Sequence, residues 1–140
     1  MDIKNSIEKA KDFALKRLIE FIGVLILGFS IFIFTALISY SPNDPNFIFP
    51  KNQEINNILG FNGSIGADFL LQSIGLISYF LPITLIFLSI AIIYQKKLIQ
   101  ILNCLFYIVC YSIVGTIFLT QFYKEAYFLI INGNGGFVGD

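Results

Sequence analysis

The residues of this chain that could perform chemistry are few, and they form no pattern that an enzyme uses. The sequence contains no histidine, which excludes catalytic triads and metal sites built on histidine. Its two cysteines, Cys104 and Cys110, are six residues apart. On one helix that spacing separates them by about 120°, so they cannot pair with each other. The glycine run at 133–139 lacks the Gly-Lys-Ser/Thr ending of a phosphate loop. We therefore expect no catalytic, cofactor-binding or metal-binding residue in this chain.

Most of the remaining polar residues in apolar surroundings have types that suit helix packing. Ser112, Gly115 and Thr116 would form one face of a helix, on which a second helix can approach closely. Asn103 fits two interpretations equally well: a hydrogen bond between helices, or a polar residue near lipid headgroups.

Long stretches without a charged residue predict the membrane helices that would carry these residues. The chain is 56% hydrophobic and 13% charged, and about 20 apolar residues suffice for a helix to cross a ~30 Å hydrocarbon core. No acidic or basic residue lies within the stretches, which argues against a proton relay or an ion-coupled site. We predict an all-α, polytopic helical membrane protein with three transmembrane helices and the start of a fourth. The expected spans are 21–40, 68–94 and 98–123, with the start of the fourth helix at 134–140.

The distribution of basic residues predicts the orientation. Seven of the nine Lys and Arg residues lie in 1–20 or at Lys96 and Lys97, and basic residues favour the cytoplasmic side. Residues 1–20 are thus expected to be a cytoplasmic N-terminal segment, and their apolar residues recur at helical spacing, which predicts an amphipathic helix running into the first span. This segment fits a contact with a lipid surface or a partner, but a basic flank that only sets the topology is the favoured interpretation. A membrane domain follows at 21–140. The first apolar run is too long for the core of a signal peptide, and no Ala-x-Ala cleavage pattern follows it, so it is interpreted as a retained helix.

Turn-forming residues interrupt the apolar pattern in two places. Ser41-Pro42-Asn43-Asp44-Pro45 should end the first helix and open an outer loop at 41–67, because proline lacks the N–H that a helix needs. Pro82 falls inside the second span and should kink it, with Ser78 available to satisfy the freed carbonyl.

Several short motifs support a more specific prediction than composition and helix length allow. The segment from Ser41 to Phe47 resembles the Ser-Pro-x-Asp-Pro-x-aromatic signature that follows the first membrane helix of FtsK/SpoIIIE-type DNA translocases. Residues 57–70 resemble that family's N-x-x-G-x-x-G-A-x-x-A-D-x-L pattern, with Ser64 where the family has alanine. The glycine run is similar to the Gly-Gly-x-x-Gly that opens its fourth helix. The residues that carry the resemblance are Ser41, Pro42, Asp44, Pro45, Phe47, Asn57, Gly60, Gly63, Ala67, Asp68, Gly75, Tyr79, Pro82, Gly135, Gly136 and Gly139.

The resemblance implies an N-terminal four-helix membrane anchor at the division septum of the bacterial inner membrane. In that family a linker and a hexameric, DNA-pumping ATPase follow, so the 140 residues are expected to be a fragment of a longer protein. The expected partners are the lipid bilayer, other division proteins and further copies of this chain. DNA, ATP and Mg²⁺ would be bound only by the motor domain, and this segment would not be an enzyme. The alternative is a fragment of a small membrane transporter or permease, in which internal repeats and a polar site at the midplane are expected.

Overall fold

The computed structural model describes residues 3–45, 54–123, 125 and 132–140, and every regular element among them is a helix. The prediction of an all-α chain is confirmed. Within these described ranges, three helices, counted across the bend in the second, are long and apolar enough to cross a membrane: Lys4–Ile38, Gly60–Gln95 and Ile99–Phe122. The elements are α1 (Ile3–Ile38), α2 (Gly60–Ile74), the 3₁₀ helix η1 (Gly75–Tyr79), α3 (Phe80–Gln95), α4 (Ile99–Phe122) and α5 (Gly136–Gly139).

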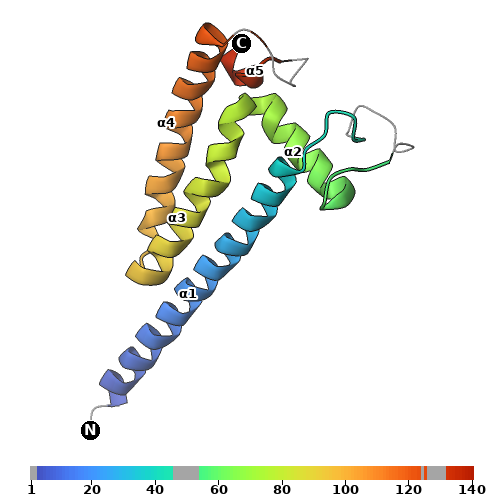
Figure 1. The fold of residues 1–140 in the computed structure, drawn as a ribbon. Helices are drawn as coiled ribbons and strands as arrows, with labels where there is room; N and C mark the ends of the chain where they lie inside the picture. Colours follow the sequence, from blue (N-terminus) through green and yellow to red (C-terminus); the bar gives the residue numbers. More distant parts are fainter. Residues whose placement is uncertain (1–2, 46–53, 124, 126–131) are drawn as a thin grey trace.

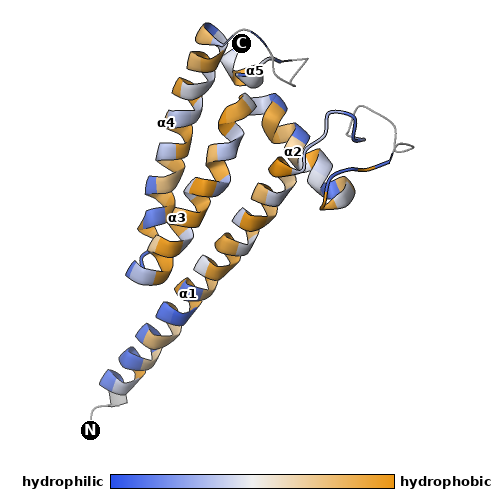
Figure 2. Cartoon of the chain, in the orientation of Figure 1, coloured by the Kyte–Doolittle hydropathy of each residue, from blue (hydrophilic) through white to orange (hydrophobic). Residues whose placement is uncertain are grey.

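The long helices α1, α3 and α4 lie side by side, with α3 between the other two (Figure 1). Orange, apolar positions run along all three (Figure 2). Large apolar side chains of α4, such as Phe106 and Val114, are more than 60% exposed. In a bilayer such side chains contact lipid rather than water, which explains why so little apolar surface is buried inside the protein.

The buried core forms two small clusters along α1. Near its C-terminal end, Ile33, Ala36 and Leu37 pack against Ala67 and Leu71 of α2. The second cluster, nearer its N-terminal end, joins Ile19, Leu88, Ile92 and Cys104.

Two buried serines also connect α1 and α3 through hydrogen bonds. Ser30 Oγ donates to the carbonyl of Pro82 at 2.6 Å, and Ser89 Oγ donates to the carbonyl of Gly23 at 2.9 Å. Small polar residues of this kind let two membrane helices approach closely while satisfying their own hydroxyl groups.

The second helix differs from the prediction of one span at 68–94. It begins at Gly60, within the segment predicted to be loop, and the chain bends at η1 so that α2 lies across the end of α1 (Figure 1). The physical reason is Gly75, whose φ of 59° and ψ of −146° are accessible only to glycine. A straight helix from Gly60 to Gln95 would measure about 54 Å, far more than a bilayer core.

The predicted kink falls in front of Pro82 rather than at it. Pro82 lies in the first turn of α3, where its missing N–H is not needed. Its ring excludes a hydrogen bond to the carbonyl of Ser78, which is consistent with the 3₁₀ geometry of that segment. Ser78 does not supply the compensating bond that the sequence suggested, because its buried Oγ has no partner among the described residues.

The N-terminal segment and the first span form one helix. The sequence predicted an amphipathic helix that runs into the first span, and α1 runs unbroken from Ile3 to Ile38 and is straight in Figure 1. The side chains of residues 4–18, which we name the N-terminal arm, are all exposed. Packing against the other helices begins at Ile19 and at Glu20, which forms ion pairs with Arg17 and Lys96 at 2.6 Å each.

Candidate functional site

Asp44 is the buried centre of the turn that follows α1. The residue is only 3% exposed, and its carboxylate accepts hydrogen bonds from the backbone N–H groups of Asn56 (2.9 Å) and Asn57 (2.8 Å). The side-chain amide of Asn56 donates a third bond at 3.2 Å. The backbone of Asp44 is fixed in turn, since its N–H donates to the carbonyl of Ser41 at 3.1 Å. A carboxylate that accepts three hydrogen bonds in this way joins the turn after α1 to the segment that precedes α2.

Asn57 joins the end of α1 to the turn that leads into α2. Its amide nitrogen donates to the carbonyls of Ala36 (2.8 Å) and Ser39 (3.2 Å), at the end of α1, where helix carbonyls have no partner of their own. Its amide oxygen accepts the N–H of Leu59 at 3.0 Å, immediately before α2. A Cβ at Gly63 would overlap this oxygen, so the side chain of Asn57 fits only against glycine.

Two serines complete the connection between the end of α1, the loop and α2. Ser39 Oγ donates to the carbonyl of Thr35 at 2.7 Å and accepts the N–H of Ile58 at 3.2 Å. Ser64 Oγ donates to the carbonyl of Pro45 at 3.0 Å and is buried. Ser64, the departure from the family's alanine, thus adds a hydrogen bond between α2 and the turn.

Two tyrosines lie beside these contacts. Tyr40 donates its hydroxyl to Asp68 at 2.9 Å, and Tyr79 donates its hydroxyl to the carbonyl of Leu37 at 3.2 Å. Burial raises the pKa of Tyr40, and the hydrogen bond to Asp68 raises it further, so the phenol remains a neutral donor. We name this set of residues the clasp: Ser39, Tyr40, Asp44, Asn57, Gly63, Ser64, Asp68 and Tyr79.

Glycines form a second contact, between the bend at Gly75 and residues 134–139. The N–H of Leu76 donates to the carbonyl of Asn134 at 2.9 Å, and a Cβ on Gly75 would overlap that same carbonyl. A Cβ on Gly136 would in turn overlap the backbone of Gly75. We name this contact the glycine seam: Gly75, Gly135, Gly136 and Gly139, with Gly135 and Gly139 facing Thr116 and Thr120 of α4.

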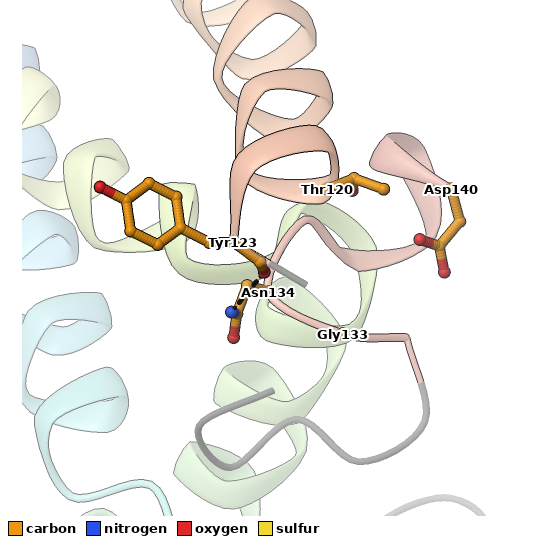
Figure 3. A pocket seen from close by; sticks show the side chains of 5 residues that line it. All are labelled: Thr120, Tyr123, Gly133, Asn134 and Asp140. Atoms are coloured by element: carbon orange, nitrogen blue, oxygen red, sulfur yellow. Dashed lines mark hydrogen bonds between the residues drawn. The ribbon is translucent and has the colours of Figure 1, made fainter. Parts of the chain in front are cut away.

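Asn134 closes the end of α4 from the same segment. Its side-chain amide donates to the carbonyls of Tyr123 (2.9 Å) and Glu125 (2.7 Å). A pocket of about 270 Å³ lies beside it, lined by Thr120, Tyr123, Gly133, Asn134 and Asp140. In Figure 3 the Tyr123 ring and the Asp140 carboxylate point to opposite sides, so these two titratable groups do not converge.

The structure gathers most of the sequence-predicted residues into the clasp and the seam. Ser41 holds the turn through its carbonyl, whereas Pro42 is exposed and Phe47 lies outside the described residues. Gly60 begins α2 with a φ of 65°, and Ala67 of the same helix is fully buried. Within the described ranges, no group of histidine, cysteine and acidic residues is arranged to hold a metal ion. Sequence reasoning missed Asn134 and Ser30, which lie in apolar or glycine-rich surroundings that conceal their partners.

These features define a polytopic helical membrane domain whose polar residues connect helices rather than converge on a substrate. The chain belongs to the FtsK/SpoIIIE family, as the motifs predicted: residues 15–140 match the 4TM region of DNA translocase FtsK/SpoIIIE. It is similar to the DNA translocase FtsK of Agrobacterium fabrum (strain C58 / ATCC 33970), with 31% identity over 130 residues. That match covers 91% of this chain and 14% of the relative, so the chain spans a small part of that protein. No solved structure matches the chain.

Proposed function

We propose that this chain is the membrane anchor of a cell-division DNA translocase and carries it to the division septum. Membership of the FtsK/SpoIIIE family supports the proposal, because the matched segment is the membrane region and not the motor. The proposed role is structural, in division-complex assembly and chromosome segregation. ATP and Mg²⁺ would be bound by a motor domain outside these residues, and DNA would be contacted only through it.

The proposal rests on the contacts that the residues of the family motifs make in the structure. Asp44 and Asn57 direct their polar atoms at backbone groups. The space that a Cβ would need is occupied by the backbone of Asn134 at Gly75, and by the backbone of Gly75 at Gly136. Residues occupied in this way are suited to fixing the shape of a surface and not to turning over a substrate. We infer that other division proteins recognise the end of the bundle that the clasp fixes, and that further copies of the chain pack beside it in the bilayer.

The proposed location is the inner membrane, with the N-terminus in the cytoplasm and the clasp on the outer side. Seven of the nine basic residues lie on the assigned cytoplasmic side. The test introduces one cysteine, as Asn5→Cys or Asn43→Cys, in a background lacking Cys104 and Cys110; positions 5 and 43 are both exposed. A membrane-impermeant thiol reagent should label position 43 in intact cells and position 5 only after permeabilisation. The reverse pattern would contradict the orientation.

Septal targeting is tested with a fluorescent fusion of the chain, extended through the fourth helix of the family, in a dividing bacterium. The fusion should collect at midcell. Asn57→Ala should reduce the midcell fraction, while Asn62→Ala, an exposed asparagine on α2, should not. Membrane fractionation of both variants controls for insertion. Uniform fluorescence around the envelope with normal insertion would refute septal targeting.

A further inference from the structure

We propose that the N-terminal arm docks along an anionic bilayer surface, as a second membrane contact in addition to the spans. Residues 4–18 are exposed, and among the side chains of α1 that the structure describes the first buried one is Ile19, at 6% exposure. Figure 1 shows α1 extending well beyond the ends of α3 and α4. The arm is about 22 Å long at helical rise. The inference requires only that α1 crosses a membrane and does not rest on the septal role.

An apolar stripe runs the length of the arm. Ile7, Ala10 and Leu18 lie within about 40° of Ala14 around the helix, and Ile7 and Leu18 are each more than half exposed. The stripe continues into the span through Phe21, which is 59% exposed. The face that contacts lipid inside the bilayer is therefore continuous with the apolar face of the arm.

Three of the five cations of the arm border this stripe, and the other two, Lys9 and Lys16, lie on the far face with the acidic residues. Lys4 and Lys11 lie about 80° and 60° from its centre on one side, and Arg17 lies about 60° away on the other. The acidic residues of the arm, Glu8 and Asp12, lie about 120° and 160° away. A helix resting on its stripe would bring its border cations to the level of lipid phosphates and keep its carboxylates in water.

An anionic bilayer suits this face better than a second copy of the arm. A coiled coil needs apolar positions sustained over about three heptads, whereas the arm is shorter and Arg17 falls on the seam that Ala10 and Ala14 would continue. The bilayer, in contrast, is tethered to the arm at a high effective concentration. Docking requires the straight helix of Figure 1 to bend, because the arm must lie on the bilayer surface while the span crosses the bilayer. The bend is placed at 17–19, because the ion pair with Lys96 fixes Glu20 just beyond these residues.

The test uses the whole chain in vesicles, with an environment-sensitive fluorophore on a single cysteine in a background lacking Cys104 and Cys110. Ile7→Cys places the probe on the stripe, and Asn5→Cys places it on the opposite face. In vesicles of phosphatidylglycerol and phosphatidylcholine, the probe at 7 should be shielded from an uncharged aqueous quencher, and the probe at 5 should remain accessible. In pure phosphatidylcholine the shielding at 7 should fall.

Two double variants, each of which removes two lysine charges, distinguish docking through the stripe from a general electrostatic attraction between the arm and the bilayer. Lys4→Gln/Lys11→Gln removes border cations, and the matched control Lys9→Gln/Lys16→Gln removes cations from the far face. The border pair should lower the docked-to-free ratio about 25-fold, since each surface lysine contributes about a fivefold effect. The control should retain most of the shielding. Equal losses in both variants, equal quenching at 5 and 7, or shielding that depends on protein density and not on lipid charge would each overturn the proposal.

Discussion

The two ends of α1 are held in opposite ways. Beyond Ile38 the chain enters the clasp, where Asp44 and Asn57 are 3% and 4% exposed and each bonds to several backbone groups. At the other end, residues 4–18 are all exposed, and the ion pair of Arg17 with Glu20 stays within the same helix. One end is determined by side chains from other segments of the chain, and the other by contacts within its own helix.

This difference teaches where polar side chains are needed in a membrane domain. A helix satisfies its own backbone except at its ends. Where α1 ends next to α2, no regular structure supplies partners for its last carbonyls, and Asn57 supplies them instead. The arm needs no such help, so its polar residues are available for the solvent or for a lipid surface. Each of the following changes tests one side of this comparison.

The largest effect is expected from Gly75→Ala, in the glycine seam. The new Cβ would overlap the carbonyl of Asn134 while φ is 59°, so the free energy of unfolding should fall by about 3 kcal/mol or more. The matched control is Gly28→Ala, in α1, where nothing lies within 4 Å of a Cβ. Denaturant unfolding in detergent micelles measures both variants. Equal stability of the two would show that the seam does not hold the bend.

Asn57→Ala should produce the next largest loss, about 2–4 kcal/mol, because it removes the side-chain partner of the carbonyls of Ala36 and Ser39 and of the N–H of Leu59. Asn62→Ala removes the same group from an exposed position of α2 and should change stability by less than about 0.5 kcal/mol. The same unfolding assay applies. A loss below about 1 kcal/mol for Asn57→Ala would mean that water replaces the amide easily, and the clasp would then be a weak contact.

Tyr79→Phe removes a single hydrogen bond to the carbonyl of Leu37 and should cost about 1 kcal/mol. Tyr94→Phe is the control, because Tyr94 is 82% exposed and the structure gives it no hydrogen bond among the described residues. Thermal unfolding followed by circular dichroism resolves a difference of this size. An unchanged midpoint for Tyr79→Phe would exclude the hydroxyl from the clasp.

The smallest effect on stability is expected in the arm. Lys4→Gln/Lys11→Gln should leave the unfolding free energy within about 0.5 kcal/mol of the parent chain, because these side chains are exposed. A larger loss, measured in micelles without anionic lipid, would reveal a tertiary contact of the arm and would remove the contrast between the two ends of α1.

The sequence was sufficient to locate the membrane helices because charge-free runs of adequate length are a direct requirement of the bilayer. The run at 98–123 corresponds closely to α4, which spans Ile99–Phe122. The bend at Gly75 was not predictable, since Gly63 and Gly66 lie within α2 without bending it. What distinguishes Gly75 is the backbone of Asn134, which is remote in sequence.

The candidate site could be predicted as a set of residues but not as a set of contacts. Family motifs singled out Asp44 and Asn57, yet their partners include the carbonyl of Ala36, and a backbone carbonyl leaves no trace in a sequence. Pro82 was expected to act through a kink inside the span. In the structure, the carbonyl of Pro82 accepts a hydrogen bond from the hydroxyl of Ser30, a residue 52 positions earlier in the chain.

Amide hydrogen exchange, read by mass spectrometry on the chain in lipid nanodiscs, tests most directly the claim that the clasp is a fixed structure. Asn56 and Asn57 lie outside any helix, so their amides should exchange slowly only if Asp44 holds them. We predict slow exchange there and faster exchange in the arm, and a selective rise at 56–57 in Asp44→Asn. Fast exchange at 56–57 in the parent chain, or no change on substitution, would contradict the account.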